Sequence, residues 1–132
     1  MIRLVVLLCC AGMPVQAETA TAQGGVLRWL DKLSGATEDV TMPAGQTLER
    51  GQLTIRMDEC RYPANDPSSD AFAHLTIMDN RAQAIAFDGW MIASSPALSA
   101  MDHARYDVWV LNCDVPGLGP AAPADTDSGE DE

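Results

Sequence analysis

Two serines and a neighbouring aspartate–histidine pair are the residues of this chain that most resemble catalytic machinery. Ser94 and Ser95 stand before Pro96, and Asp102 and His103 follow a few residues later. A serine nucleophile needs a base, an acid that orients the base and an oxyanion site. Adjacent residues on a helix point about 100° apart, so Asp102 and His103 do not make a base–acid pair. Because the G-x-S-x-G and S-x-x-K arrangements are also missing at these serines, we expect no catalytic residue here.

The same stretch has a simpler interpretation as the start of a helix. Ser95 is suited to cap the helix and Pro96 to occupy its first position. Leu98 and Met101 would then share one face of a short amphipathic helix. Leu98 stands where a capping box would need Glu or Gln, so the cap depends on the serine alone. His103, near the expected helix end, would make a favourable contact with the helix dipole.

Oxygen-bearing side chains gather in residues 61–70, where they raise the question of a calcium site. Their spacing matches no known calcium loop and Pro67 interrupts it, so a turn-rich loop is the better interpretation. The residues concerned are Asn65, Asp66, Ser68 and Asp70. His74 follows with no recognisable ligand partners, and we expect it at the surface. The sequence predicts no metal site and no other cofactor.

The first 17 residues, MIRLVVLLCCAGMPVQA, have the features of a signal peptide. One arginine precedes an apolar run, and Val15-Gln16-Ala17 fits a small-residue cleavage pattern. The run is too short to cross a bilayer as a stable helix. Leu8 before Cys9 argues against lipid attachment, which needs a small residue at that place. We expect export to the periplasm, with no membrane span after cleavage; a buried N-terminal helix is the alternative.

Cys60 and Cys113 are the two cysteines that remain after such a cleavage. An exported protein is in a compartment that permits disulfides. A bridge between them closes a loop of about fifty residues, worth roughly 4 kcal/mol in the chain-entropy model. A metal pair or a redox pair is the alternative, but neither cysteine has C-x-x-C spacing or a histidine cluster nearby. We predict a structural disulfide.

Composition divides the rest of the chain into three parts. Residues 18–23 are expected to be a flexible N-terminus, residues 24–114 one β-rich domain, and residues 115–132 a disordered acidic tail rich in proline and glycine. The 132-residue chain has a net charge of −11. Nucleic acids and anionic membranes attract basic patches, so this balance argues against both as partners.

Apolar residues alternate through most of the domain, which predicts a mainly β fold, a small antiparallel β-sandwich or barrel with one short helix. Strands are expected at 26–33, 36–42, 51–60, 71–79, 82–88 and 106–113. A bulge or strand end is expected near Asp58-Glu59, because strict alternation would turn Cys60 to the polar face. The residues expected to point inward are Leu53, Ile55, Met57, Ala73, Leu75, Ile77, Ile85 and Phe87.

The last strand, YDVWVLNC from Tyr106, is apolar on both faces. Tyr106, Val108 and Val110 share one face, and Cys113 falls on the other with Trp109. This pattern predicts a central strand. The three tryptophans are more typical of a core than of a ligand platform, although an exposed one would mark a contact site. We take Trp90, Tyr106 and Trp29 as the candidate partner or ligand contacts.

Four runs, WLDKLSG, LTIRMDEC, GWMIASSPALSA and YDVWVLNC, together resemble the domain of unknown function 2155 family, small exported proteins of alphaproteobacteria. The resemblance covers about residues 25–113. It implies that the family pattern includes Trp90, Ser94, Ser95, Pro96, Tyr106, Asp107, Trp109 and both cysteines. The family has no assigned activity, so the resemblance implies a location and a fold but no reaction. Its members are often encoded beside an accessory subunit of respiratory complex I.

The sequence is therefore compatible with three classes of function. The leading one is a non-enzymatic periplasmic binding or accessory module for an envelope or inner-membrane protein, with respiratory complex I as one specific partner. The alternative is a small-ligand-binding β-barrel in which Trp90 or Trp109 stacks on the ligand. The third, an enzyme using Ser94 or Ser95, lacks the partners that such a nucleophile needs.

Overall fold

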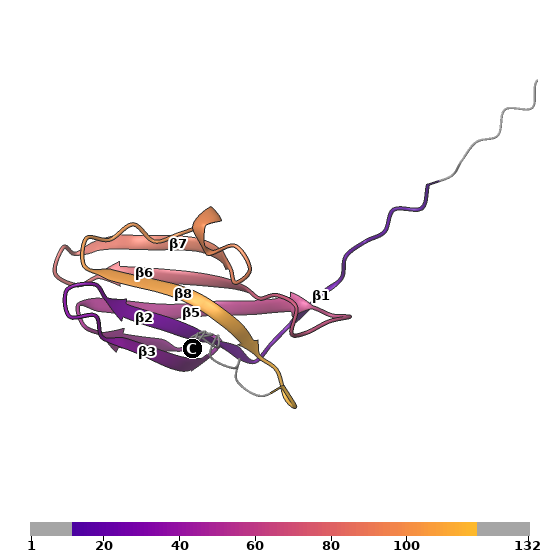
Figure 1. The fold of residues 1–132 in the computed structure, drawn as a ribbon, viewed down its shortest axis with the longest axis horizontal. Coiled ribbons are helices and arrows are strands. Elements are labelled where there is room, and N and C mark those ends of the chain that lie inside the picture. The colour runs from indigo at the N-terminus through magenta and orange to yellow at the C-terminus, as the bar shows by residue number, and fades with distance from the viewer. Residues whose placement is uncertain (1–11, 119–132) are drawn as a thin grey trace, which may run out of the picture.

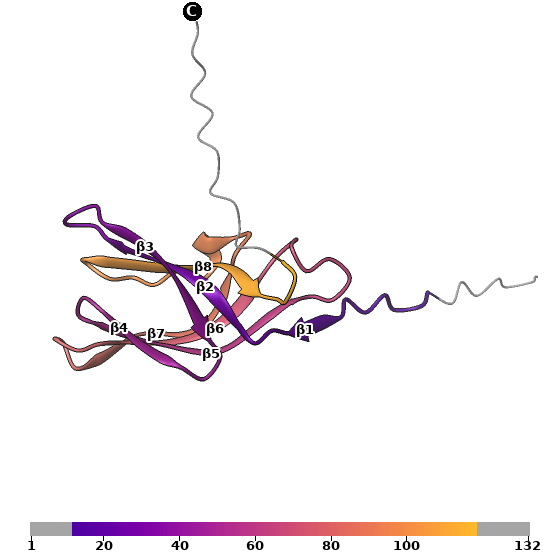
Figure 2. The same cartoon turned by 90° about the horizontal axis from the view of Figure 1, so that it is seen from below.

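Alternating apolar residues build two antiparallel sheets that face each other in the computed structural model, which describes residues 12–118 (Figures 1 and 2). The five-stranded sheet has the order β1-β5-β6-β7, with β4 also paired to β5; the three-stranded sheet has the order β3-β2-β8. The strands of the first are β1 (Thr19–Thr21), β4 (Thr47–Arg50), β5 (Leu53–Pro63), β6 (Phe72–Asp79) and β7 (Ala84–Ile92). Those of the second are β2 (Gly24–Asp31), β3 (Thr37–Pro43) and β8 (Tyr106–Asp114), and one short helix, η1 (Pro96–Leu98), lies between β7 and β8. The predicted mainly β fold is confirmed.

The residues before β2 differ from the expected flexible N-terminus. Within residues 18–23, β1 pairs with β5 and Ala22 is buried. Most of the expected signal peptide (residues 1–11) and of the expected acidic tail (residues 119–132) lie outside the described residues. Across residues 12–118, the structure contains no helix with the length and apolarity that a membrane crossing requires.

The core lies between the sheets and is filled mainly from β5 and β6. The inward positions of both strands are buried as predicted: Leu53, Ile55, Met57, Ala73, Leu75 and Ile77. A register shift between Met57 and Glu59 confirms the predicted bulge. The extra residue shifts the alternation by one position, so that Cys60 points into the core and is completely buried.

A second bulge makes the prediction for Ile85 wrong. Ile77 pairs with Phe87 but Met78 pairs with Ile85, so Ala86 is an extra residue in β7. The strand before this bulge therefore has the opposite phase. Ile85 lies on the outer face opposite Met78 and is 54% exposed, whereas Phe87 packs against the core.

The prediction that the last strand is central is also wrong, because β8 is an edge strand paired only with β2. Leu27 pairs with Val110 and Val26 with Asn112, which makes Leu111 an extra residue. This bulge moves Cys113 onto the buried face shared by Tyr106, Val108 and Val110. The opposite face is apolar for a different reason: residues between β7 and β8 lie against Trp109, as described below.

Two of the three bulged strands, β5 and β8, meet at the disulfide. Cys60 of β5 is bonded to Cys113 of β8, with their Cα atoms 5.7 Å apart, and the predicted bridge is confirmed. Gly25 pairs with Cys113 in the neighbouring strand, and a Cβ atom there would lie 3.0 Å from the Cys60 sulfur. The absence of a side chain at residue 25 therefore leaves room for the disulfide between the two sheets.

Tyr106 joins the sheets near the other end of β8. Its ring lies 5.5 Å from the Trp29 ring and 5.4 Å from the His103 ring, measured between centroids. Gly51 has a positive φ of 55°, and a Cβ atom on it would lie 2.6 Å from the Tyr106 hydroxyl oxygen. The turn before β5 can therefore approach the tyrosine only because residue 51 has no side chain.

The sequence suggested that His103 contacts the end of a helix. This prediction is wrong, because η1 ends at Leu98. His103 Nδ1 accepts hydrogen bonds from the backbone N–H groups of Arg105 and Tyr106, at 3.0 and 3.1 Å. The ring proton is therefore on Nε2, which lies 2.8 Å from Asp79 Oδ2 and donates to it. This bond holds the loop after β6 against the segment that enters β8.

The buried Asp31–Arg105 pair generates a pH prediction. Asp31 is 6% exposed, and Arg105 Nη2 lies 3.0 Å from its Oδ2. The hydrogen bond from Arg105 lowers the pKa of Asp31 from its ordinary value of 3.8 to about 2. A carboxyl group with a lowered folded-state pKa stabilises the fold above the unfolded value and loses this contribution as the pH falls through the folded value.

We therefore expect Asp31→Asn to lower the free energy of unfolding at pH 7 and to flatten its decline between about pH 4 and pH 2. Urea titrations at successive pH values measure this. Asp102→Asn, a change at an exposed residue, is the control and should keep the wild-type slope. A difference between wild type and Asp31→Asn that stays constant down to pH 2 would contradict the assignment.

Candidate functional site

Ser94, one of the two serines singled out by the sequence, has a structural role. Ser94 donates from Oγ to Asp70 Oδ2 at 2.7 Å, and its backbone N–H donates to Asp70 Oδ1 at 3.0 Å. Asp70, expected to belong to a turn, thus ties the loop before β6 to the end of β7. His103, the only histidine near these serines in sequence, is engaged with Asp79 instead.

The helix prediction is right about where the helix starts and wrong about its extent and its cap. Pro96 is the first residue of η1, but η1 is a single 3₁₀ turn that ends at Leu98. The Ser95 side chain makes no capping hydrogen bond; its carbonyl accepts from the Leu98 N–H at 3.1 Å. Because the turn ends there, Leu98 is 77% exposed while Met101 is buried, so the two do not share a face.

His74 has partners that the sequence did not reveal. Its Nδ1 lies 2.9 Å from Asp58 Oδ2, which also accepts a hydrogen bond from Thr76 Oγ1 at 2.8 Å. The His74 and Trp90 rings meet edge to face with centroids 5.2 Å apart. These residues come from three neighbouring strands, and pairing register rather than sequence spacing brings them together. Among residues 12–118, no group of three or more His, Cys, Asp or Glu residues is arranged to hold a metal ion.

Of the three predicted contact residues, only Trp90 is well exposed. It lies on the outer face of the five-stranded sheet, is 39% exposed, and has the Arg61 guanidinium carbon 5.3 Å from its ring centroid. Tyr106 is 2% exposed, so the prediction that it contacts a partner is wrong: it fills the core beneath Gly51. Trp29 is half-buried and packs against Tyr106, as a core residue does.

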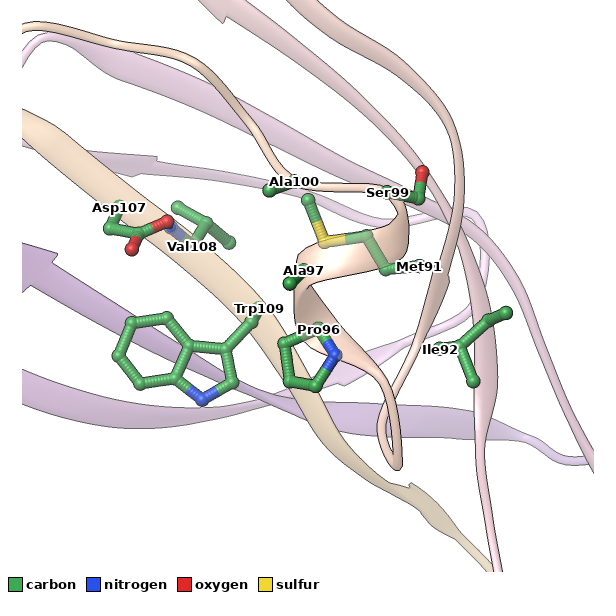
Figure 3. Close-up of a pocket in the computed structure, with 9 residues that line it drawn as sticks. All are labelled: Met91, Ile92, Pro96, Ala97, Ser99, Ala100, Asp107, Val108 and Trp109. Carbon is green, nitrogen blue, oxygen red and sulfur yellow. The ribbon is translucent and has the colours of Figure 1, made fainter.

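An apolar cleft lies where the edges of the two sheets come together. We call it the β8 cleft; its volume is about 290 Å³. Figure 3 shows side chains of β7, of the η1 segment and of β8 around this space. The lining residues are Met91, Ile92, Pro96, Ala97, Ser99, Ala100, Asp107, Val108 and Trp109.

The β8 cleft follows the free edge of β8. This strand pairs with β2 on one side, and no other described strand pairs with its second side. Asp107 closes part of this edge itself, because its Oδ1 accepts a hydrogen bond from the Val108 N–H at 2.9 Å. A carboxylate along an edge strand discourages another strand from pairing there. The edge is therefore suited to receive side chains in the cleft rather than a new strand.

The cleft was missed from the sequence because it depends on β8 being an edge. Its three walls come from residues 91–92, 96–100 and 107–109, all within one stretch of the chain. One feature of the sequence pointed to the cleft: the outer face of the last strand is apolar at Trp109, which indicates that another segment packs against this face. The η1 segment of the same chain takes this place, and it covers only part of the edge.

Comparisons with known proteins found one curated relative and one family model that match this chain. A curated relative, an uncharacterized protein of Rickettsia prowazekii (strain Madrid E), is 25% identical over 100 residues, which are 74% of this chain and 64% of the relative. No solved structure matches the chain. The model of the family described as uncharacterized protein conserved in bacteria (DUF2155) matches residues 25–113, from β2 to the second cysteine. The chain belongs to this family.

Proposed function

We propose that this protein is an exported, non-enzymatic binding module of the bacterial envelope and that the β8 cleft holds its partner. The cleft itself carries the proposal: an apolar space beside Trp109, at a sheet edge that the chain covers only in part. Partner sites in proteins are commonly apolar pockets with an aromatic anchor and few polar groups.

Two further observations support the proposal. The side chains best able to do chemistry are engaged in holding the fold, since Ser94 is bonded to Asp70 and His103 to Asp79. The Cys60–Cys113 bridge and the apolar N-terminal run are both typical of a protein that is exported to an oxidising compartment. Respiratory complex I is the specific partner suggested by the gene neighbourhood of the family.

Photo-crosslinking in living cells tests the docking site. A photoreactive amino acid at Ala97, an exposed residue on the lip of the cleft, should form an adduct with one envelope protein. The same amino acid at Thr41, an exposed residue of β3, is the matched control and should form none. An adduct with a complex I subunit would support that partner. Equal adducts at both positions, or none at Ala97, would contradict the proposed site.

A second candidate function is the binding of a small apolar ligand in the same cleft. Its volume of about 290 Å³ is close to the lower limit of about 300 Å³ for small-molecule pockets, so the ligand would have to be small. In a Trp29→Phe, Trp90→Phe variant, Trp109 is the remaining tryptophan of the three. Its fluorescence should change when a ligand enters. Emission that stays the same across a panel of metabolites and lipids would exclude this candidate.

A further inference from the structure

We propose that the β8 cleft recognises an ammonium group on an aliphatic stem, as in a lysine side chain of the partner protein. This inference rests on the proposed function, because it names the chemistry of what the cleft holds. Three features of the cleft carry it: a carboxylate with no cation partner in the described part of the chain, apolar walls beside it, and a tryptophan ring among the lining residues.

Asp107 supplies the negative charge. Oδ1 of its half-buried side chain accepts a hydrogen bond from the Val108 N–H, and Oδ2 has no hydrogen-bond donor among residues 12–118. Basic side chains of the surrounding segments are used elsewhere. Arg28, which lies opposite Trp109 in β2, pairs with Asp39. Arg105 pairs with Asp31, and Lys32 Nζ donates to the His103 carbonyl at 2.6 Å. No described ion pair includes Asp107, whereas five arginines have carboxylate partners, namely Arg28, Arg50, Arg56, Arg61 and Arg105.

The walls of the cleft fit the stem of such a side chain. Met91, Pro96 and Ala97 offer methylene, methyl and ring carbon atoms, and Figure 3 shows them in the space beside Trp109. Lysine characteristically lays its four-carbon stem along apolar surface and keeps its charged end at a polar site. The face of a tryptophan also attracts cations, so Trp109 and Asp107 favour the same ligand charge.

The geometry of Asp107 leaves one of its carboxylate oxygens for a basic partner. Val108 donates to Oδ1, and a lysine ammonium, a compact charge on a flexible stem, needs only Oδ2. Strand addition is disfavoured at the same point, because Asp107 holds the edge N–H that an added strand would need. The net charge of −11 attracts a basic partner from a distance.

The proposal is tested with n-hexylammonium and n-hexanol, which share the aliphatic stem and differ in charge. Each is titrated into the ¹⁵N-labelled, disulfide-bonded protein while amide chemical shifts are followed. We expect shifts at residues 97–100 and 107–109, and binding of n-hexylammonium roughly five-fold tighter than that of n-hexanol. Asp107→Asn, whose amide oxygen can still accept from Val108, should remove the preference. Asp102→Asn, which removes the same charge from an exposed residue nearby, should leave the preference intact.

The possible results separate this inference from the proposed function. Equal binding of the two compounds in the cleft would overturn the ammonium preference and leave an apolar docking site. A preference that survives Asp107→Asn would also overturn it, because the attraction would then come from the overall charge. Binding of neither compound at residues 97–100 and 107–109 would overturn both the ammonium site and the cleft as the binding site.

Discussion

The bond between Cys60 and Cys113 is the constraint on which the rest of this fold depends. It joins the five-stranded sheet to the three-stranded sheet across 53 residues of sequence. Closing a loop of this length stabilises a protein by roughly 4 kcal/mol, a large share of the 5–15 kcal/mol typical of small domains. Each cysteine faces the core only because a bulge precedes it, at Asp58 in β5 and at Leu111 in β8.

The disulfide fixes β8 at one end, and a polar and aromatic network fixes it at the other. There Tyr106 packs under Gly51, His103 binds Asp79, and Arg105 pairs with Asp31. Between the disulfide and this network, β8 lies at the edge of its sheet and faces the end of β7 and the η1 segment. Because both ends of the strand are held in place, its apolar edge stays partly uncovered, and this edge forms the β8 cleft.

The local sequence pattern predicted those parts of the fold that depend on neighbouring residues. The alternation in β5 and β6, the bulge before Cys60 and the start of η1 at Pro96 follow from neighbouring residues. The disulfide joins residues 53 apart and followed instead from the count of cysteines left after the expected cleavage. The bulges at Ala86 and Leu111 carried no comparable signal, and each reverses the inward and outward faces of part of a strand. This is why the inward or outward orientation of Ile85 and of Cys113 was predicted wrongly.

The candidate site was less predictable because it depends on contacts between distant residues. Asp70 binds Ser94 across 24 residues, and Asp79 binds His103 across the same interval. Neither partner could be identified from spacing, so a capping role was assigned to Ser95 and a helix-end role to His103. The cleft required knowing that β8 is an edge strand, which is a property of sheet order rather than of the strand itself.

Native-state amide hydrogen exchange, compared between the disulfide-bonded and the reduced protein, tests this account most directly. If the bridge seats β8, reduction should speed exchange in Tyr106–Asp114 far more than in β6, which has a strand partner on each side. Residues 96–100, which lie against β8 at the cleft, should follow it. Unchanged protection of β8 after reduction, or an equal loss in β6 and β8, would contradict the central claim that the Cys60–Cys113 bond holds this strand and its cleft in place.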